Sequence, residues 1–174
     1  GASHAKACGA LSAFGPFHMP TIQTRLVSAP DHHLILPLLA AYGAEMTPHL
    51  AGTAPAQAPE MLKLIANDPR AEILAAFRAD EALGFALFFD LPEIVFARRC
   101  GALDDLFVRP AARRRGVAQG LIEALSEIGR DRAWSHLRWI VPETDQGAIA
   151  LYERIAARAP WRSYVLRLDP TGSL

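Results

Sequence analysis

The chain has 174 residues, of which 51% are apolar, and its 18 basic and 18 acidic residues give a formal net charge of zero. A chain of this length suits one domain with a substantial core. Because there is no overall basic excess, the composition argues against bulk attraction to nucleic acid or to an anionic membrane surface. No apolar run approaches the ~20 residues that a membrane-spanning helix needs.

The cysteines and histidines indicate neither a disulfide framework nor a metal site. Cys8 and Cys100 are the only cysteines, and neither lies in a spacing typical of metal ligands. His32 and His33 are adjacent, so on a helix they would point in different directions. We therefore expect a cytoplasmic protein with reduced thiols and no bound metal.

The first part of the chain predicts an extension, one strand and two helices. Residues 1–20 are rich in small residues and lack the apolar segment of a secretory signal, so we expect an N-terminal extension before one domain at 21–174. Hydrophobic periodicity and turn residues predict a strand at 22–27, a helix opening at 29–31, a loop at 48–59 and a short helix at 60–67.

The rest of the chain predicts a hairpin and then alternating helices and strands. The expected elements are strands at 72–78, 83–90 and 103–108, a helix over 117–128, a strand at 137–141, a helix at 146–157 and a strand at 163–168. This order is typical of a mixed α/β sheet with helices packed on its faces. It shows no internal repeat and no domain boundary.

One segment predicts a binding site for phosphate. A strand stops at Pro110, three arginines follow at 113–115, and an amphipathic helix begins after Gly116. The first amides of a helix lack intrahelical partners and carry partial positive charge, so they bind phosphate where small residues permit close approach. Gly116 and Ala118 are small enough, and arginine adds bidentate hydrogen bonds.

Taken alone, this segment also fits a solvated basic turn before an ordinary surface helix. A nucleic-acid patch over 109–115 is another alternative, although no aromatic residues interleave with the arginines as single-strand binding requires. A nucleotide P-loop is excluded because the Gly-Lys-Ser/Thr ending is missing.

The pattern Arg113-x-x-Gly116-x-Ala118 after Leu106-Phe107-Val108-x-Pro110 resembles the acetyl-CoA motif of the GNAT superfamily of N-acetyltransferases. Within that superfamily, the chain is similar to the spermidine/spermine (diamine) acetyltransferase branch. The similarity extends over more than half of the chain in five correctly spaced segments, at 83–89, 104–110, 137–141, 148–154 and 161–168.

The resemblance implies a seven-stranded type of mixed, mostly antiparallel sheet with helices on both faces. The sheet should splay where the strand at 103–108 meets the strand at 137–141, and the pantetheine arm of acetyl-CoA should lie in that opening. The implied cofactor contacts come from Leu106, Phe107, Val108, Arg113, Arg114, Arg115, Gly116, Val117, Ala118, Gln119, Asp145, Ala148 and Tyr152.

Three positions depart from the family pattern. Arg114 and Ala118 stand where the loop commonly has its first and last glycines, and Asp145 stands where asparagine usually precedes the last helix. We expect these differences to affect cofactor affinity and the hydrogen bonding of pantetheine, and not the fold.

Tyr152 matches the family's tyrosine, which the resemblance places to protonate the departing sulfur after an amine attacks the acetyl carbonyl directly. A phenol with a pKa near ~10 is protonated at neutral pH and can donate to a thiolate. Periodicity alone would instead make Tyr152 part of an apolar helical stripe with Ile149 and Ile155. The matching flanking residues favour the catalytic hypothesis.

Asp104 matches an acidic residue that the family places near the substrate amine, where it would relay a proton through water or hold the ammonium group. The alternative is an ordinary strand-end carboxylate paired with an arginine. Asp105 follows on the opposite face of a regular strand, so only one of the two can point into a given cleft. Trp139 and Glu93 are further candidates for substrate contacts.

The resemblance thus predicts transfer of the acetyl group of acetyl-CoA to a primary amine, such as a small diamine, a polyamine or an amino acid side chain, by a homodimer. Alternatives are acetylation of a protein N-terminus or lysine, a non-catalytic acetyl-CoA-binding module, and a nucleic-acid-binding domain. Strong salt dependence of binding would identify the last of these.

Overall fold

A computed structural model describes residues 21–49 and 54–166 of the chain. The predicted extension at 1–20 and part of the predicted loop at 48–59 lie outside these ranges. No helix within them is both long enough and apolar enough to cross a bilayer.

Among the described residues, five strands and four α-helices follow one another in the order that the sequence predicts as far as residue 155. The elements are β1 (Ile22–Leu26), α1 (His32–Met46), α2 (Ala58–Ala66), β2 (Ala71–Arg78), β3 (Glu81–Glu93), β4 (Arg98–Val108), α3 (Val117–Asp131), β5 (Trp134–Arg138) and α4 (Gln146–Ile155). Most bounds differ from the predicted ones by a few residues, and β5 begins three residues early.

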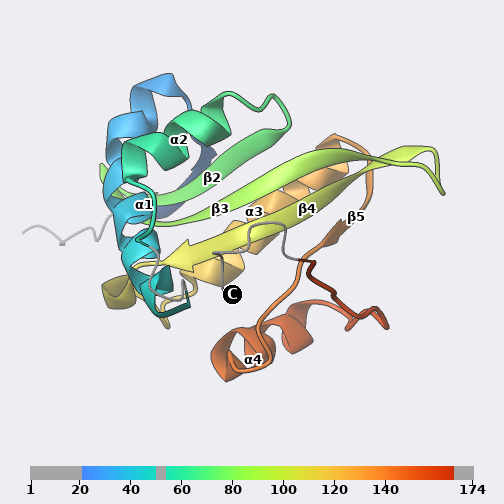
Figure 1. Cartoon of the computed structure of the whole chain (residues 1–174). Coiled ribbons are helices and arrows are strands. Elements are labelled where there is room, and N and C mark those ends of the chain that lie inside the picture. The colour runs from blue at the N-terminus through green and yellow to red at the C-terminus, as the bar shows by residue number, and fades with distance from the viewer. Residues whose placement is uncertain (1–20, 50–53, 167–174) are drawn as a thin grey trace, which may run out of the picture.

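The strands form one curled sheet in the order β1-β2-β3-β4-β5 (Figure 1). β1 to β4 pair antiparallel, and β5 pairs parallel to β4. The parallel step is possible because α3 crosses over the sheet between β4 and β5. The predicted mixed, mostly antiparallel sheet is therefore confirmed.

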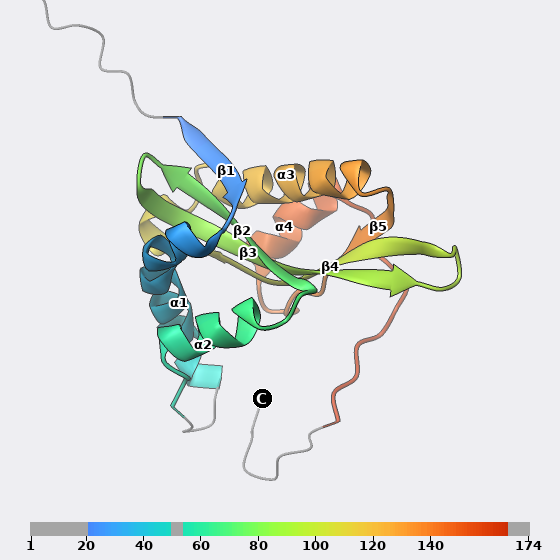
Figure 2. The same cartoon turned by 90° about the horizontal axis from the view of Figure 1, so that it is seen from above.

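Helices cover both faces of this sheet, also as predicted (Figure 2). Alternate side chains of β2 divide between two cores: Ala75 and Phe77 pack with α1 and α2, whereas Leu74 and Ala76 pack with α3. Since both faces are buried, β2 and β3 are apolar at nearly every position and do not alternate with polar residues.

The predicted opening between β4 and β5 is present. The two strands pair from Arg99 opposite Trp134 to Ala102 opposite Arg138, and no pairing between them extends further. β4 continues to Val108, so in the described part of the chain its edge from 103 to 108 has no strand partner on that side.

Trp134 anchors the paired end of β5 in a slot made by two glycines. A Cβ atom on Gly101 would lie 2.2 Å from the indole ring, and one on Gly129 would lie 2.7 Å from it. The indole also packs at 5.9 Å against the ring of Phe88. Two missing side chains therefore make room for one large one at the point where β4, α3 and β5 meet.

β4 contains a bulge at Asp104. Leu87 pairs with Asp105 and Phe88 pairs with Leu103, so Asp104 is an extra residue without a partner on β3. A bulge shifts the alternation of a strand by one position. Leu103 accordingly faces the α3 core, whereas Asp105 faces α1 on the other side of the sheet.

The predicted strand at 163–168 is wrong in the part that can be compared. Residues 163–166 form no strand, and 167 and 168 lie outside the described residues. Trp161, Tyr164 and Leu166 are exposed, so nothing packs on this segment, and a strand needs a neighbour to complete its backbone hydrogen bonds. The described ranges thus hold five strands instead of seven.

Candidate active site

The phosphate loop, residues 109–116, has the backbone geometry of a ligand-binding turn. A short 3-10 turn at Pro110–Ala112 ends β4, and the chain then passes through Gly116, whose φ of 79° suits glycine, into α3. Gly116 provides no side-chain cap, so the first amides of α3 keep their hydrogen-bonding capacity. A Cβ at Gly116 or Gly120 would meet nothing within 4 Å, which leaves this end of the helix open to a ligand.

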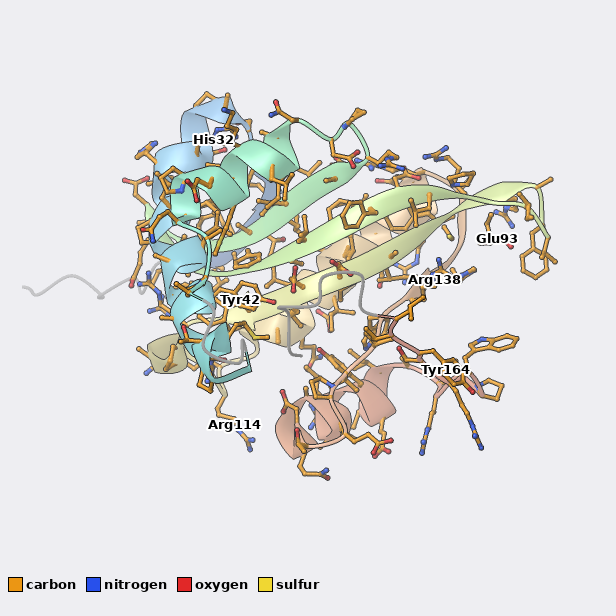
Figure 3. The ribbon with its side chains drawn as sticks, viewed as in Figure 1. His32, Tyr42, Glu93, Arg114, Arg138 and Tyr164 are labelled. Atoms are coloured by element: carbon orange, nitrogen blue, oxygen red, sulfur yellow. The ribbon has the colours of Figure 1, made fainter. Side chains whose placement is uncertain are left out.

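The three arginines of the loop differ in orientation. Arg113 turns inward, where its Nε donates to the carbonyl of Val108 at 2.8 Å and its terminal nitrogen pairs with Glu45 at 2.5 Å. Arg114 has a φ of 61° and points away from the body of the molecule beyond the end of α1 (Figure 3). Arg115 is exposed as well. Arg114 therefore has a left-handed backbone conformation. Glycine, which the family commonly has at this position, adopts that conformation without strain.

The unpaired edge of β4 offers backbone groups beside this loop. The amide of Arg109 donates to the carbonyl of Leu83 on β3 at 3.0 Å. Because backbone groups alternate in direction along a strand, those of Leu106 and Val108 point to the opposite, unpaired edge. An extended ligand can pair there as an additional strand. The carbonyl of Val108 is occupied by Arg113.

α4 lies beyond this edge of the sheet, on the same side as α3 (Figures 1 and 2). Asp145 caps it, since its Oδ1 accepts a hydrogen bond from the amide of Ala148 at 2.9 Å. An aspartate serves this N-cap function as well as asparagine does, which accounts for the departure at this position. On the first turns of α3, Gln119 donates to Glu123 at 2.8 Å.

Tyr152 of α4 and Trp139, which follows β5, contact each other. Their rings pack edge to face with centroids 5.3 Å apart, and both rings are half-buried against the α3 core. Burial, with a smaller contribution from the negative charge of Asp145, raises the pKa of Tyr152. The phenol therefore keeps its proton throughout the neutral range and is able to act as a proton donor.

The structure distinguishes Asp104 from Asp105. Asp104 is exposed at the bulge, whereas Asp105 is half-buried and accepts a hydrogen bond from the hydroxyl of Tyr42 on α1. The ring of Tyr42 packs at 5.7 Å against both Phe85 and Phe107, so the hydroxyl is firmly placed (Figure 3). The two carboxylates thus lie at the start of the unpaired edge, one open to solvent and one held by Tyr42.

Asp105 should make stability depend on pH. Burial raises its pKa most, and the hydrogen bond from Tyr42 lowers it less. Since the folded pKa exceeds the unfolded one, the stabilising contribution of Asp105 is complete below about pH 4 and is lost as the pH rises through the folded pKa. We expect Asp105→Asn to raise the thermal midpoint by a few degrees at pH 7.5, roughly 2–4 °C per kcal/mol.

This gain should disappear near pH 4, and scanning calorimetry of both proteins at the two pH values measures it. The exposed turn variant Asp80→Asn is the control and should change the midpoint little at either pH. A gain from Asp105→Asn that is larger in acid than at pH 7.5 would contradict this assignment.

Glu93 is not brought to the other candidates. It lies at the far end of the long β3–β4 hairpin (Figure 3), where its carboxylate accepts from the amides of Val95 at 3.1 Å and Phe96 at 2.8 Å. This side chain shapes the turn. With about 3.3 Å per strand residue, it is roughly 20 Å along β4 from Asp104.

Tyr42, Glu45 and Asp105 form contacts that the sequence did not predict as part of the site. Tyr42 follows Leu38 by four residues, so periodicity places it on the buried face of α1, and its polar hydroxyl was the available signal. Asp105 lies 63 residues after Tyr42, and Arg113 lies 68 residues after Glu45. No local sequence pattern reveals contacts over such separations.

Comparisons with known proteins agree with this geometry. The model of the acetyltransferase (GNAT) family matches residues 38–157. A thialysine N-epsilon-acetyltransferase of Caenorhabditis elegans is 34% identical over 83 residues, which are 46% of this chain and 49% of that protein. The aligned part thus spans about half the length of this curated relative.

Solved structures share the fold over almost their whole length. A ribosomal-protein-alanine N-acetyltransferase from Brucella melitensis biovar Abortus 2308 has a TM-score of 0.74 and 32% identity, covering 86% of this chain and 100% of its own. An aminoglycoside acetyltransferase from an uncultured soil metagenomic sample has a TM-score of 0.70 and 25% identity, covering 86% and 99%. Because the family model covers well over half of the chain, the protein belongs to the acetyltransferase (GNAT) family.

Proposed function

We propose that this enzyme acetylates the primary amine of a small molecule, such as a diamine, a polyamine or an amino acid side chain. The observation that carries the proposal is the pair of carboxylates, Asp104 and Asp105, at the point where β4 loses its partner strand. Neighbouring negative charges stabilise an ammonium group. A relative named for acetylating the ε-nitrogen of thialysine supports the same class of acceptor.

Each part of the site has a task in this proposal. Acetyl-CoA supplies an activated acetyl thioester when it is bound. The first amides of α3 and the side chain of Arg115 bind its phosphates, and the edge groups of Leu106 pair with its pantetheine arm. Asp104 holds the incoming ammonium group and relays the proton of that group to water, so that the neutral amine can attack the acetyl carbonyl. The protonated phenol of Tyr152 donates a proton to the departing sulfur.

The test is a panel of amines assayed with acetyl-CoA by following thiol release. We expect diamines or basic amino acids to be acetylated, and Asp104→Asn to lower kcat/KM for them by tenfold or more, in line with the ~10²–10⁴-fold range of acid–base catalysis or the loss of one charged contact. Asp80→Asn, which removes the same charge from a distant turn, should leave kcat/KM unchanged. Tight binding of coenzyme A without thiol release for any amine would instead indicate a non-catalytic module.

A protein N-terminus is the second candidate acceptor, because the structure from Brucella melitensis biovar Abortus 2308 belongs to a ribosomal-protein-alanine N-acetyltransferase. A peptide that begins with alanine, included in the same panel, separates the two hypotheses. A kcat/KM for the peptide that exceeds those for all small amines would replace the first proposal with this one.

We further propose that the enzyme is a homodimer with its C-terminal segment in the contact. Trp161, Tyr164, Val165 and Leu166 are all largely exposed, although they are apolar and follow one another closely. Light scattering at assay concentrations should give twice the mass of the chain. A monomer would contradict this proposal.

A further inference from the structure

Arg113 is held by three contacts, two with the end of β4 and one with the end of α1. Its Nε donates to the carbonyl of Val108 at 2.8 Å, its terminal nitrogen pairs with Glu45 at 2.5 Å, and its guanidinium lies 5.8 Å from the ring centre of Phe107. These contacts join the phosphate loop, the end of β4 and the end of α1. Both charged side chains remain about half exposed, so their ion pair is a modest, surface interaction.

The same end of α1 also contacts β4 at the two carboxylates that we propose bind the acceptor amine. Tyr42 lies three residues before Glu45, on the same face of the helix, and its hydroxyl holds Asp105. α1 therefore contacts β4 through Tyr42 and Asp105, and contacts the phosphate loop through Glu45 and Arg113. A shift of α1 would move both contacts together.

Arg113 also limits the unpaired edge of β4. The carbonyl of Val108 points to that edge and already accepts a hydrogen bond from Arg113, so a ligand that extends along the edge would share this carbonyl with Arg113. If Arg113 were released, the loop after β4 would lose its fixed position relative to the edge. The distance between the first amides of α3 and the backbone groups of Leu106 would then no longer be fixed.

We propose that Glu45 and Arg113 are positioning residues that fix the phosphate loop against β4 and α1, and that the guanidinium of Arg113 does not itself bind phosphate. This inference rests on the proposed cofactor site, and it adds a role for Glu45 of α1, which contacts the loop through Arg113. Arg115 and the amides of α3 then provide the direct phosphate contacts.

The variant Glu45→Gln tests this because the two roles of Arg113 predict opposite signs. If Arg113 bound phosphate, removing Glu45 would free its guanidinium and remove a negative charge, so coenzyme A would bind more tightly. If the pair positions the loop, coenzyme A should bind about two- to fivefold more weakly, the range that an exposed ion pair provides. Calorimetric titration with coenzyme A measures the affinity without any acceptor amine.

Three further variants complete the experiment. Glu127→Gln removes the same charge from an exposed position on α3 and should leave the affinity unchanged. In an Arg113→Ala background, Glu45→Gln should have no further effect, because the two residues act as one unit. Arg115→Ala should weaken binding about tenfold as the loss of one charge-assisted contact.

Tighter or unchanged binding by folded Glu45→Gln, with a thermal midpoint near that of the wild type, would overturn the positioning role. Unchanged binding by Arg115→Ala would instead overturn the placement of the cofactor at this loop, and the proposal with it. The affinities of these variants therefore separate a failure of the positioning role from a failure of the proposed site.

Discussion

Replacing Tyr152 with phenylalanine is expected to lower kcat by about 100-fold while coenzyme A affinity stays nearly constant. The substitution removes only the hydroxyl and keeps the ring that packs at 5.3 Å against Trp139. Because burial raises the pKa of the phenol, the wild-type side chain is protonated at neutral pH, and its loss removes a donor that is always available there. Steady-state kinetics on the best amine of the panel, with coenzyme A titration, measure both quantities.

The matched control for this variant is Tyr164→Phe, which removes the same hydroxyl outside the proposed catalytic site, from the segment proposed to form the dimer contact, and keeps the ring that such a contact would bury. Its kcat should equal that of the wild type. Turnover unchanged in a folded Tyr152→Phe protein would remove Tyr152 from the mechanism and leave water as the proton donor. A loss confined to the KM for acetyl-CoA would instead make Tyr152 a cofactor-binding residue.

The second large effect concerns stability: we expect Gly101→Ala to lower the free energy of unfolding by about 2–3 kcal/mol. The added methyl group would lie 2.2 Å from the indole of Trp134, and both partners are confined, one by the β4 backbone and the other by the slot. For a chain of this size, the thermal midpoint should fall by roughly 4–12 °C. Denaturant and thermal unfolding followed by circular dichroism measure the change.

Gly120→Ala provides the comparison, since the same substitution there meets nothing within 4 Å and lies within a helix. It should leave stability unchanged or raise it by up to about 1 kcal/mol, because alanine favours helix. Equal stability of Gly101→Ala and the wild type would show that Trp134 does not occupy the slot between the two glycines.

The order of elements was predictable because each depends on a local pattern. The helical spacing of Val117, Leu121 and Leu125 predicts α3, and all three side chains are buried. The opening of the sheet followed from the family resemblance. The limits of the strands were harder to predict, because β5 begins where Trp134 finds room beside Gly101 and Gly129, and Gly101 lies on β4, more than 30 residues earlier in the chain.

The site was predicted in part, and for the same reason. The loop at 113–116 shows a local motif, and the structure gives it an uncapped helix start and open space. The orientation of Arg113 depends on Glu45, which lies 68 residues earlier in the chain. Alternation correctly allows only one of Asp104 and Asp105 to face α1, but it is the bulge that makes this residue Asp105.

The bulge at Asp104 also determines which changes of length this enzyme can tolerate. Leu103 and Asp105 already face opposite sides of the sheet, as neighbours in a regular strand do, so deleting Asp104 would restore a regular strand without moving any other β4 side chain to the other face. Leu106 and Val108 would keep facing α3 and Phe107 would keep facing α1, so both cores would stay packed as they are. Under the role that we propose for the two carboxylates, acceptor preference can therefore change by deletion of Asp104 as well as by substitutions at 104 and 105, because the deletion leaves both cores intact.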